Sequence, residues 1–340
     1  MRIENVVRSH KGRSSRLLAA AAALAALSAP RGAAAQPATR RVWAWADGSA
    51  AAVAQWRNAS WRGVFDGVQA SCGLGFVALS ADAVELQVNT TEFDACRPLL
   101  AAVRETGGLF EVWTGGIPAE CLTSAAAAAS AAASAARVAA ALGIDGLSLD
   151  DESDCAPRST LSNFSAWSGV VDEIAAALGA DGRSLSAAVQ AMFGIQDVPY
   201  RPLCSPPEAP QCSQACALPP WAYAPNARVV DLMARSAIGR WLVMDTYYFT
   251  TARFLNAIDW YSSSVPTEKL SVAVMNRDDL SSDDLAARFH ALDRAGVDLF
   301  SVFMLPASDE WLPWLRKWKT RCATCPNAGA LSCYEPSLQC

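Results

Sequence analysis

The stretch GIDGLSLDDES, residues 143–153, places four carboxylates within eight positions: Asp145, Asp150, Asp151 and Glu152. Only 18% of the chain is charged, and a long alanine tract precedes this stretch. Carboxylates that lie close together repel, and the repulsion raises the pKa of one of them. A carboxyl group with a raised pKa can act as a general acid near neutral pH. The alternative interpretation is a solvated acidic strand end.

The order of residues within this stretch favours the chemical interpretation. Side chains alternate along a strand, so Ser148, Asp150 and Glu152 share one face, while Leu147 and Leu149 lie on the other. In a barrel of parallel strands, the polar face would line the interior and rise toward the carboxyl ends of the strands, where active sites of such barrels lie. The pattern therefore predicts Glu152 as a general acid with Asp150 beside it.

The rest of the chain alternates between strand-like and helix-like segments. Helical spacing or composition marks residues 94–105, 124–142, 162–178 and 281–296. Strand-like runs cover residues 41–46, 63–70, 75–80, 108–116, 142–150, 183–191, 241–249, 270–275 and 297–305. This alternation predicts parallel strands with crossover helices, and the number of units predicts an α/β fold of the (β/α)8 TIM-barrel type. A doubly wound sheet is the main alternative, but no Gly-rich phosphate loop follows the first strand.

Composition divides the chain into three segments. Residues 1–35 have a basic start, a short apolar core and small residues before Gln36, which is the pattern of a secretory signal peptide. We expect a barrel over residues 36–319 and a Cys-rich tail over 320–340. The leader carries six basic residues and one acid, so the remainder holds 22 Lys and Arg against 32 Asp and Glu. This acidic balance argues against a nucleic-acid partner.

Cysteine usage and glycosylation motifs agree with export. The chain has eleven cysteines, three of them in a Pro-rich loop at 200–224 and four in the tail. Disulfides are the expected state in a secreted chain, and the odd number leaves at least one cysteine unpaired or bonded to another chain. A zinc knuckle is the alternative for the tail. Sequons occur at Asn58, Asn89 and Asn163. We expect a monomer that is secreted or that resides in the lumen of the secretory pathway or a lysosome-like compartment. We expect no membrane segment after signal cleavage.

The segment Asp145-Gly-Leu-Ser148-Leu-Asp150-Asp-Glu152 resembles the DGxDxDxE signature of family 18 glycoside hydrolases, which include chitinases, chitobiases and endo-N-acetylglucosaminidases. EVWTGG resembles the SxGG turn of strand three, SLSAAVQA resembles strand five, and KLSVAVM resembles strand seven. The resemblance extends over roughly residues 41–318 and implies a barrel that needs no cofactor and no metal. It also implies hydrolysis of β-linked N-acetylglucosamine with retention, assisted by the substrate's own acetamido group.

The resemblance implies specific roles. Glu152 would protonate the glycosidic oxygen, Asp150 would orient the acetamido group, and Asp145 would support them. Ser148 stands where the family usually has Asp. The MxYD segment of strand six is also altered to Met-Asp245-Thr-Tyr247-Tyr, so that Tyr247 is the expected acetamido partner with Asp245 nearby. Four tryptophans near strand ends, Trp43, Trp45, Trp113 and Trp311, are candidates for stacking on sugar rings.

Three functional hypotheses follow. The first is a secreted hydrolase that acts on chitin fragments or N-glycan cores. The second is an inactive barrel that binds N-acetyl sugars as a lectin, which the change at Ser148 and in strand six would favour. The third is a glycosidase of another family whose substrate lacks an acetamido group. A Ser-His-Asp triad or a His-based metal site is disfavoured, because His290 is the only histidine beyond the leader.

Overall fold

The structure is a computed structural model that describes residues 40–118, 124–150, 164–189, 233–244, 246, 250–275 and 280–320. Residues 39–340 form one compact unit. The predicted leader, the Pro-rich loop, all but the first residue of the tail, and the site residues Glu152, Asp245 and Tyr247 lie outside the described residues. They stay predictions.

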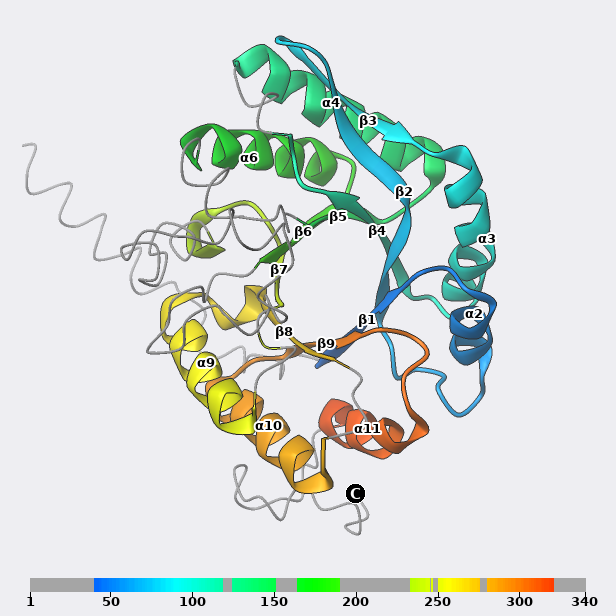
Figure 1. The fold of residues 1–340 in the computed structure, drawn as a ribbon, viewed down its shortest axis with the longest axis vertical. Coiled ribbons are helices and arrows are strands. Elements are labelled where there is room, and N and C mark those ends of the chain that lie inside the picture. Colours follow the sequence, from blue (N-terminus) through cyan, green and yellow to red (C-terminus); the bar gives the residue numbers. More distant parts are fainter. Residues whose placement is uncertain are drawn as a thin grey trace, which may run out of the picture. The chain divides into compact units, whose positions relative to one another are not determined.

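Eight of the strands in the described residues close into a parallel barrel, as the sequence predicts (Figure 1). The order around the barrel follows the chain, and β1 pairs with both β9 and β2 to complete the ring. The strands are β1 (Arg41–Ala46), β2 (Gly67–Ser80), β4 (Leu109–Gly115), β5 (Gly146–Asp150), β6 (Ser184–Val189), β7 (Arg240–Val243), β8 (Leu270–Met275) and β9 (Leu299–Phe303). The acidic stretch therefore includes the fourth barrel strand, β5.

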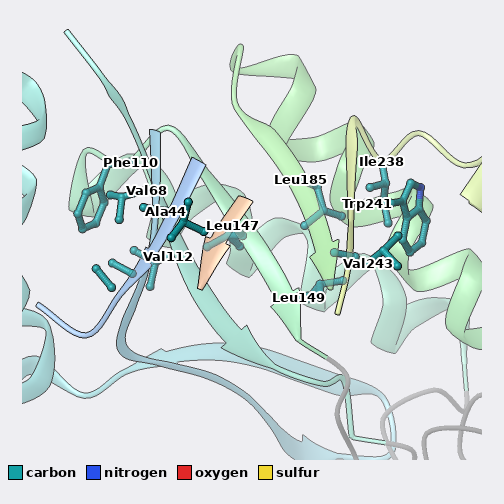
Figure 2. Close-up of a cluster of buried hydrophobic side chains, with 14 of the residues drawn as sticks. Ala44, Val68, Phe110, Val112, Leu147, Leu149, Leu185, Ile238, Trp241 and Val243 are labelled. Carbon is teal, nitrogen blue, oxygen red and sulfur yellow. The ribbon is translucent and has the colours of Figure 1, made fainter. Parts of the chain in front are cut away.

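Helices surround the barrel (Figure 1). They are α2 (Ala50–Arg57), α3 (Thr90–Glu105), α4 (Ala125–Leu142), α6 (Phe164–Ala180), α9 (Thr251–Ser264), α10 (Ser282–Ala295) and α11 (Leu312–Thr320), with short 3-10 turns η3 (Thr267–Lys269) and η4 (Asp309–Trp311). Every second strand residue points outward to form the main hydrophobic core (Figure 2). Leu147 and Leu149 belong to this layer, which leaves Ser148 and Asp150 for the interior, as the alternation predicts.

The prediction of separate strands at 63–70 and 75–80 was wrong. One strand, β2, runs through Gly67–Ser80 and then forms an antiparallel hairpin with β3 (Ala83–Val88), which the sequence analysis missed. The turn lacks the Asn-Gly or Asp-Gly signal that marks a tight hairpin. The outer edge of β3 is covered by α4, because the Ser134 hydroxyl accepts a hydrogen bond from the Leu86 amide at 2.9 Å.

Cys72 of β2 and Cys96 of α3 form a disulfide. This bond agrees with the expectation of disulfides in the chain, although its connectivity could not be deduced from the sequence. The two cysteines are 24 residues apart, so the cross-link contributes about 3 kcal/mol by restricting the unfolded chain. It joins the second barrel strand to the helix that covers it.

Helix α4 corrects the expectation that no segment after the leader is apolar enough to span a membrane. By length and composition alone, this helix is long and apolar enough to cross a membrane. Its buried alanines instead pack against α6 and β3, and alanine allows this close approach because its side chain is small. Ser124 caps the start, and Gly143 ends the helix at φ 67°, a conformation that glycine adopts without strain. In this fold α4 is a barrel helix.

Helix α10 lies within the predicted helical segment 281–296; it begins with a capping box of Ser281 and Asp284 and ends at Gly296. The Thr251 hydroxyl donates a hydrogen bond to the Asp284 carboxylate at 2.5 Å, which joins α10 to α9, and the Ser281 hydroxyl donates to the same carboxylate at 2.7 Å. Both hydroxyl donors favour the ionised carboxylate and lower the pKa of Asp284 below its usual value.

This lowered pKa predicts a pH-dependent contribution to stability. A carboxyl group with a depressed folded-state pKa stabilises the protein above its unfolded pKa and loses that effect as the pH falls through the folded value. Asp284→Asn should therefore lower the free energy of unfolding at about pH 6 and have a smaller effect at about pH 3. Urea titrations of both proteins at the two pH values measure this; a gap independent of pH would contradict it.

Candidate functional site

Asp150 ends β5 inside the barrel, at the carboxyl end of the strand. Its side chain is only 8% exposed. The indole Nε1 of Trp113 on β4 donates a hydrogen bond to Asp150 Oδ2 at 2.5 Å. Because an indole N–H only donates, this contact favours the carboxylate form of Asp150. Catalytic groups of (β/α)8 barrels lie at this end of the strands.

Ser148, two residues before Asp150, lies fully buried on the same face. Gln69 of β2 donates from Nε2 to the Ser148 hydroxyl oxygen, and it also donates to Ser186 of β6 at 3.3 Å. The residue that replaces the usual acid is therefore part of a hydrogen-bond network across the barrel, which Ser186 connects to the Glu111 carboxylate. A hydroxyl at this position cannot share an acidic proton with Asp150 as a second carboxyl group would.

A buried ion pair, missed by the sequence analysis, fills the interior below this level. Glu111 of β4 and Arg240 of β7 are 2% and 5% exposed, and their charged groups are 2.5 Å apart. Ser184 and Ser186 of β6 donate to the two carboxylate oxygens at 2.7 and 2.6 Å. The Arg240 guanidinium lies 3.9 Å from the centre of the Trp43 ring. The sequence pattern that could have revealed these interior polar residues is alternation, because Gln69, Glu111 and Ser186 each stand between two apolar residues of a strand.

The interior at the carboxyl ends of β6, β7 and β8, above the ion pair, is apolar. Ala188, Leu242, Met244 and Ala273 form a small separate cluster with Phe303 packed against it. Trp45, near the end of β1, contacts the Phe303 ring with 5.0 Å between ring centres. Trp45 is partly buried, and its place near a strand end agrees with the position that a sugar-stacking residue would need.

Two predicted site residues lie apart from Asp150. Asp145 precedes β5, at the opposite end of the strand, where it accepts a hydrogen bond from the Phe110 amide and pairs with Arg104 at 2.9 Å. Trp311 is 3% exposed within the main hydrophobic core. A side chain that is so buried presents no open face to a sugar ring. Both placements favour structural roles.

The segment that corresponds to MxYD follows β7, the sixth strand of the barrel, and the structure places one of its altered residues. Thr246 stands at the tyrosine position in a gapless match to MxYD. It is fully buried, and its hydroxyl donates to the Val243 carbonyl at 2.9 Å and to the Ala273 carbonyl at 2.6 Å. Thr246 therefore ties β7 to β8 instead of facing a substrate. The roles of its neighbours, Tyr247 as the acetamido partner and Asp245 beside it, stay predictions.

Comparison with known proteins finds similarity at the level of structure. The sequence matches no family model and no curated protein. The structure is similar to a chitinase from Chromobacterium violaceum ATCC 12472, with 14% identity, a TM-score of 0.58 and coverage of 83% of this chain and 99% of the other. A GH18 chitinase from Pseudoalteromonas aurantia aligns with 12% identity, a TM-score of 0.55 and coverage of 82% and 99%.

A plant protein gives a third match. The class V chitinase from Nicotiana tobaccum, solved in complex with NAG4, aligns with 13% identity, a TM-score of 0.55 and coverage of 83% of this chain and 98% of the other. All three alignments include nearly the whole of the other chain, so the likeness concerns a complete barrel. At these identities it is a likeness of fold, and the chain has the (β/α)8 barrel fold of the family 18 chitinases.

Proposed function

We propose that the chain is a glycoside hydrolase that cleaves β-linked N-acetylglucosamine in chitin fragments or N-glycan cores. The observation that carries the proposal is the place of Asp150, a buried carboxyl group at the carboxyl end of the fourth barrel strand that accepts a hydrogen bond from Trp113. The chitinase-like fold and the signature-like sequence around Asp150 support the same class of reaction.

The chemistry that fits is substrate-assisted hydrolysis with retention. Glu152 gives its proton to the glycosidic oxygen as the bond to the anomeric carbon breaks, and the acetamido carbonyl oxygen attacks that carbon. Asp150 holds the acetamido N–H and balances the positive charge that forms on the ring intermediate. Water then opens the intermediate and returns a proton to Glu152. Every step uses side chains, the substrate itself and water.

The direct test is hydrolysis of fluorogenic N-acetylglucosamine oligomers by the secreted, mature chain. Glucose oligomers of the same length and linkage form the matched control, since they lack the acetamido group. Cleavage of the first series alone supports the proposal. Cleavage of both series would replace it with a glycosidase of another mechanism. The absence of cleavage in either series would reject hydrolysis of these linkages.

A lectin is the second candidate, and the environment of Ser148 favours it. The position that usually carries an acid holds a fully buried hydroxyl bonded to Gln69, so one carboxyl group of the expected set is missing. Calorimetric titration with unlabelled N-acetylglucosamine oligomers separates the two functions. Binding without turnover would establish a lectin, whereas turnover would exclude an inactive barrel.

We also propose that the chain acts as a monomer in an oxidising compartment of the secretory route or outside the cell. The Cys72–Cys96 disulfide supports this location, because such bonds persist in oxidising compartments. Asn58 and Asn89, which begin two of the sequons, are exposed and therefore open to glycosylation. Mass spectrometry of the secreted protein with and without glycosidase treatment tests the modification.

A further inference from the structure

Two of the departures from the family 18 sequence pattern lie side by side on neighbouring strands of the barrel wall. Ser148 stands at the usual acid position of β5, and Trp113 stands at the serine position of the SxGG-like turn of β4. The register of the two strands pairs Trp113 directly with Ser148. The Trp113 indole passes this partner and donates to Asp150, two residues farther along β5.

The groups around Asp150 show which kind of hydrogen-bond donor the Trp113 indole is. Ser148 on the same face carries no acidic proton and receives a hydrogen bond from Gln69. Glu111 of β4 and Arg240 of β7 are the charged groups that the other described strands place in the same interior, and they neutralise each other. The donor that the structure places on Asp150 Oδ2 is therefore neutral and fixed, and it is not an acid that exchanges its proton.

We infer that Trp113 is a positioning residue that holds Asp150 as an oriented carboxylate and so replaces the acid absent at position 148. This role differs from stacking on a sugar, and its catalytic consequence rests on the proposed hydrolase function. A charge-assisted hydrogen bond fixes the orientation of a carboxylate better than a neutral one does. Substrate-assisted attack depends on that orientation, because the acetamido group must meet the anomeric carbon in line.

The kinetic test uses Trp113→Phe, which keeps an aromatic ring but removes the N–H. We expect kcat on N-acetylglucosamine oligomers to fall roughly 10- to 100-fold, the usual worth of a hydrogen bond to a charged group, with KM changed less than about threefold. The acidic limb of the kcat–pH profile should move to higher pH, because the carboxylate loses a donor. A residue that only stacks on sugar would raise KM and leave the profile in place.

Trp56→Phe is the matched control. Trp56 also lies buried and donates its indole N–H, to the Thr106 hydroxyl at 2.9 Å, but it belongs to α2 outside the barrel. We expect this variant to keep the wild-type kcat and pH profile. The double variant Trp113→Ser with Ser148→Asp, which restores an acid beside Asp150, should recover activity relative to Trp113→Ser alone. The absence of recovery would contradict the proposed replacement.

A spectroscopic measurement keeps the inference separate from the proposed function. In protein with ¹⁵N-labelled tryptophan, the indole resonance lost in Trp113→Phe belongs to Trp113. We expect it to lie downfield and to move when Asp150 is replaced by asparagine, whether or not the protein hydrolyses sugars. A resonance unaffected by Asp150→Asn would overturn the inference. A sensitive resonance in a protein without turnover would reject the hydrolase and retain the hydrogen bond.

Discussion

Replacement of Glu152 by glutamine is expected to lower kcat for hydrolysis of N-acetylglucosamine oligomers by about 10²- to 10⁴-fold, the usual contribution of a general acid. Glutamine keeps the size and polarity of the side chain but has no proton to give to the leaving oxygen. The prediction follows from the spacing of the motif, because Glu152 comes two residues after Asp150, which the structure places inside the barrel. Steady-state kinetics of the two proteins measure it.

The leaving group provides the sharper form of this test. An aryl glycoside with an acidic phenol departs without much protonation, whereas a sugar hydroxyl requires it. Glu152→Gln should therefore lose much less activity on the aryl substrate than on the oligomer. Asp181→Asn is the control, since this exposed carboxylate precedes β6 at the opposite end of the barrel and pairs with Arg183. Equal losses on both substrates would show that Glu152 is not the acid.

The sequence predicted those parts of the fold that depend on periodicity and local signals. The barrel strands follow from alternation, and α4 and α10 begin and end at the residues that their caps indicate. Strand β3 was missed because its identity depends on pairing with β2 and on cover from α4, which are contacts between segments distant in sequence. Local patterns carry no information on such contacts.

The same distinction holds for the site. The interior placement of Ser148 and Asp150 followed from the two-residue period of a strand. The partners of these residues did not, because Trp113 and Gln69 reach them from other strands. The position of Trp113 near a strand end suggested stacking on a sugar ring, although its indole N–H donates a hydrogen bond to the Asp150 carboxylate. Side-chain contacts across a barrel depend on the stagger between strands and on the side-chain rotamers, and neither can be deduced from a single sequence.

The buried pair of Glu111 and Arg240 gives the largest expected effect on stability. Removal of one partner leaves a buried charge without compensation, which costs about 3–5 kcal/mol. Glu111→Gln keeps the shape of the side chain, so the loss measured by urea unfolding reports the charge. Native domains are stable by only about 5–15 kcal/mol, and this single change should therefore bring the protein close to unfolding at moderate temperature.

Two further variants distinguish a charge effect from a packing effect. Glu105→Gln breaks the exposed pair with Arg57, whose side chains are 58% and 48% exposed, and should cost less than about 1 kcal/mol. The double change Glu111→Gln with Arg240→Met removes both buried charges. If the penalty comes from an uncompensated cation, the double variant must be more stable than Glu111→Gln alone, despite losing the Arg240 contact with the Trp43 ring. A double variant that is less stable than either single one would instead mean that the pair stabilises the barrel through packing and its serine hydrogen bonds.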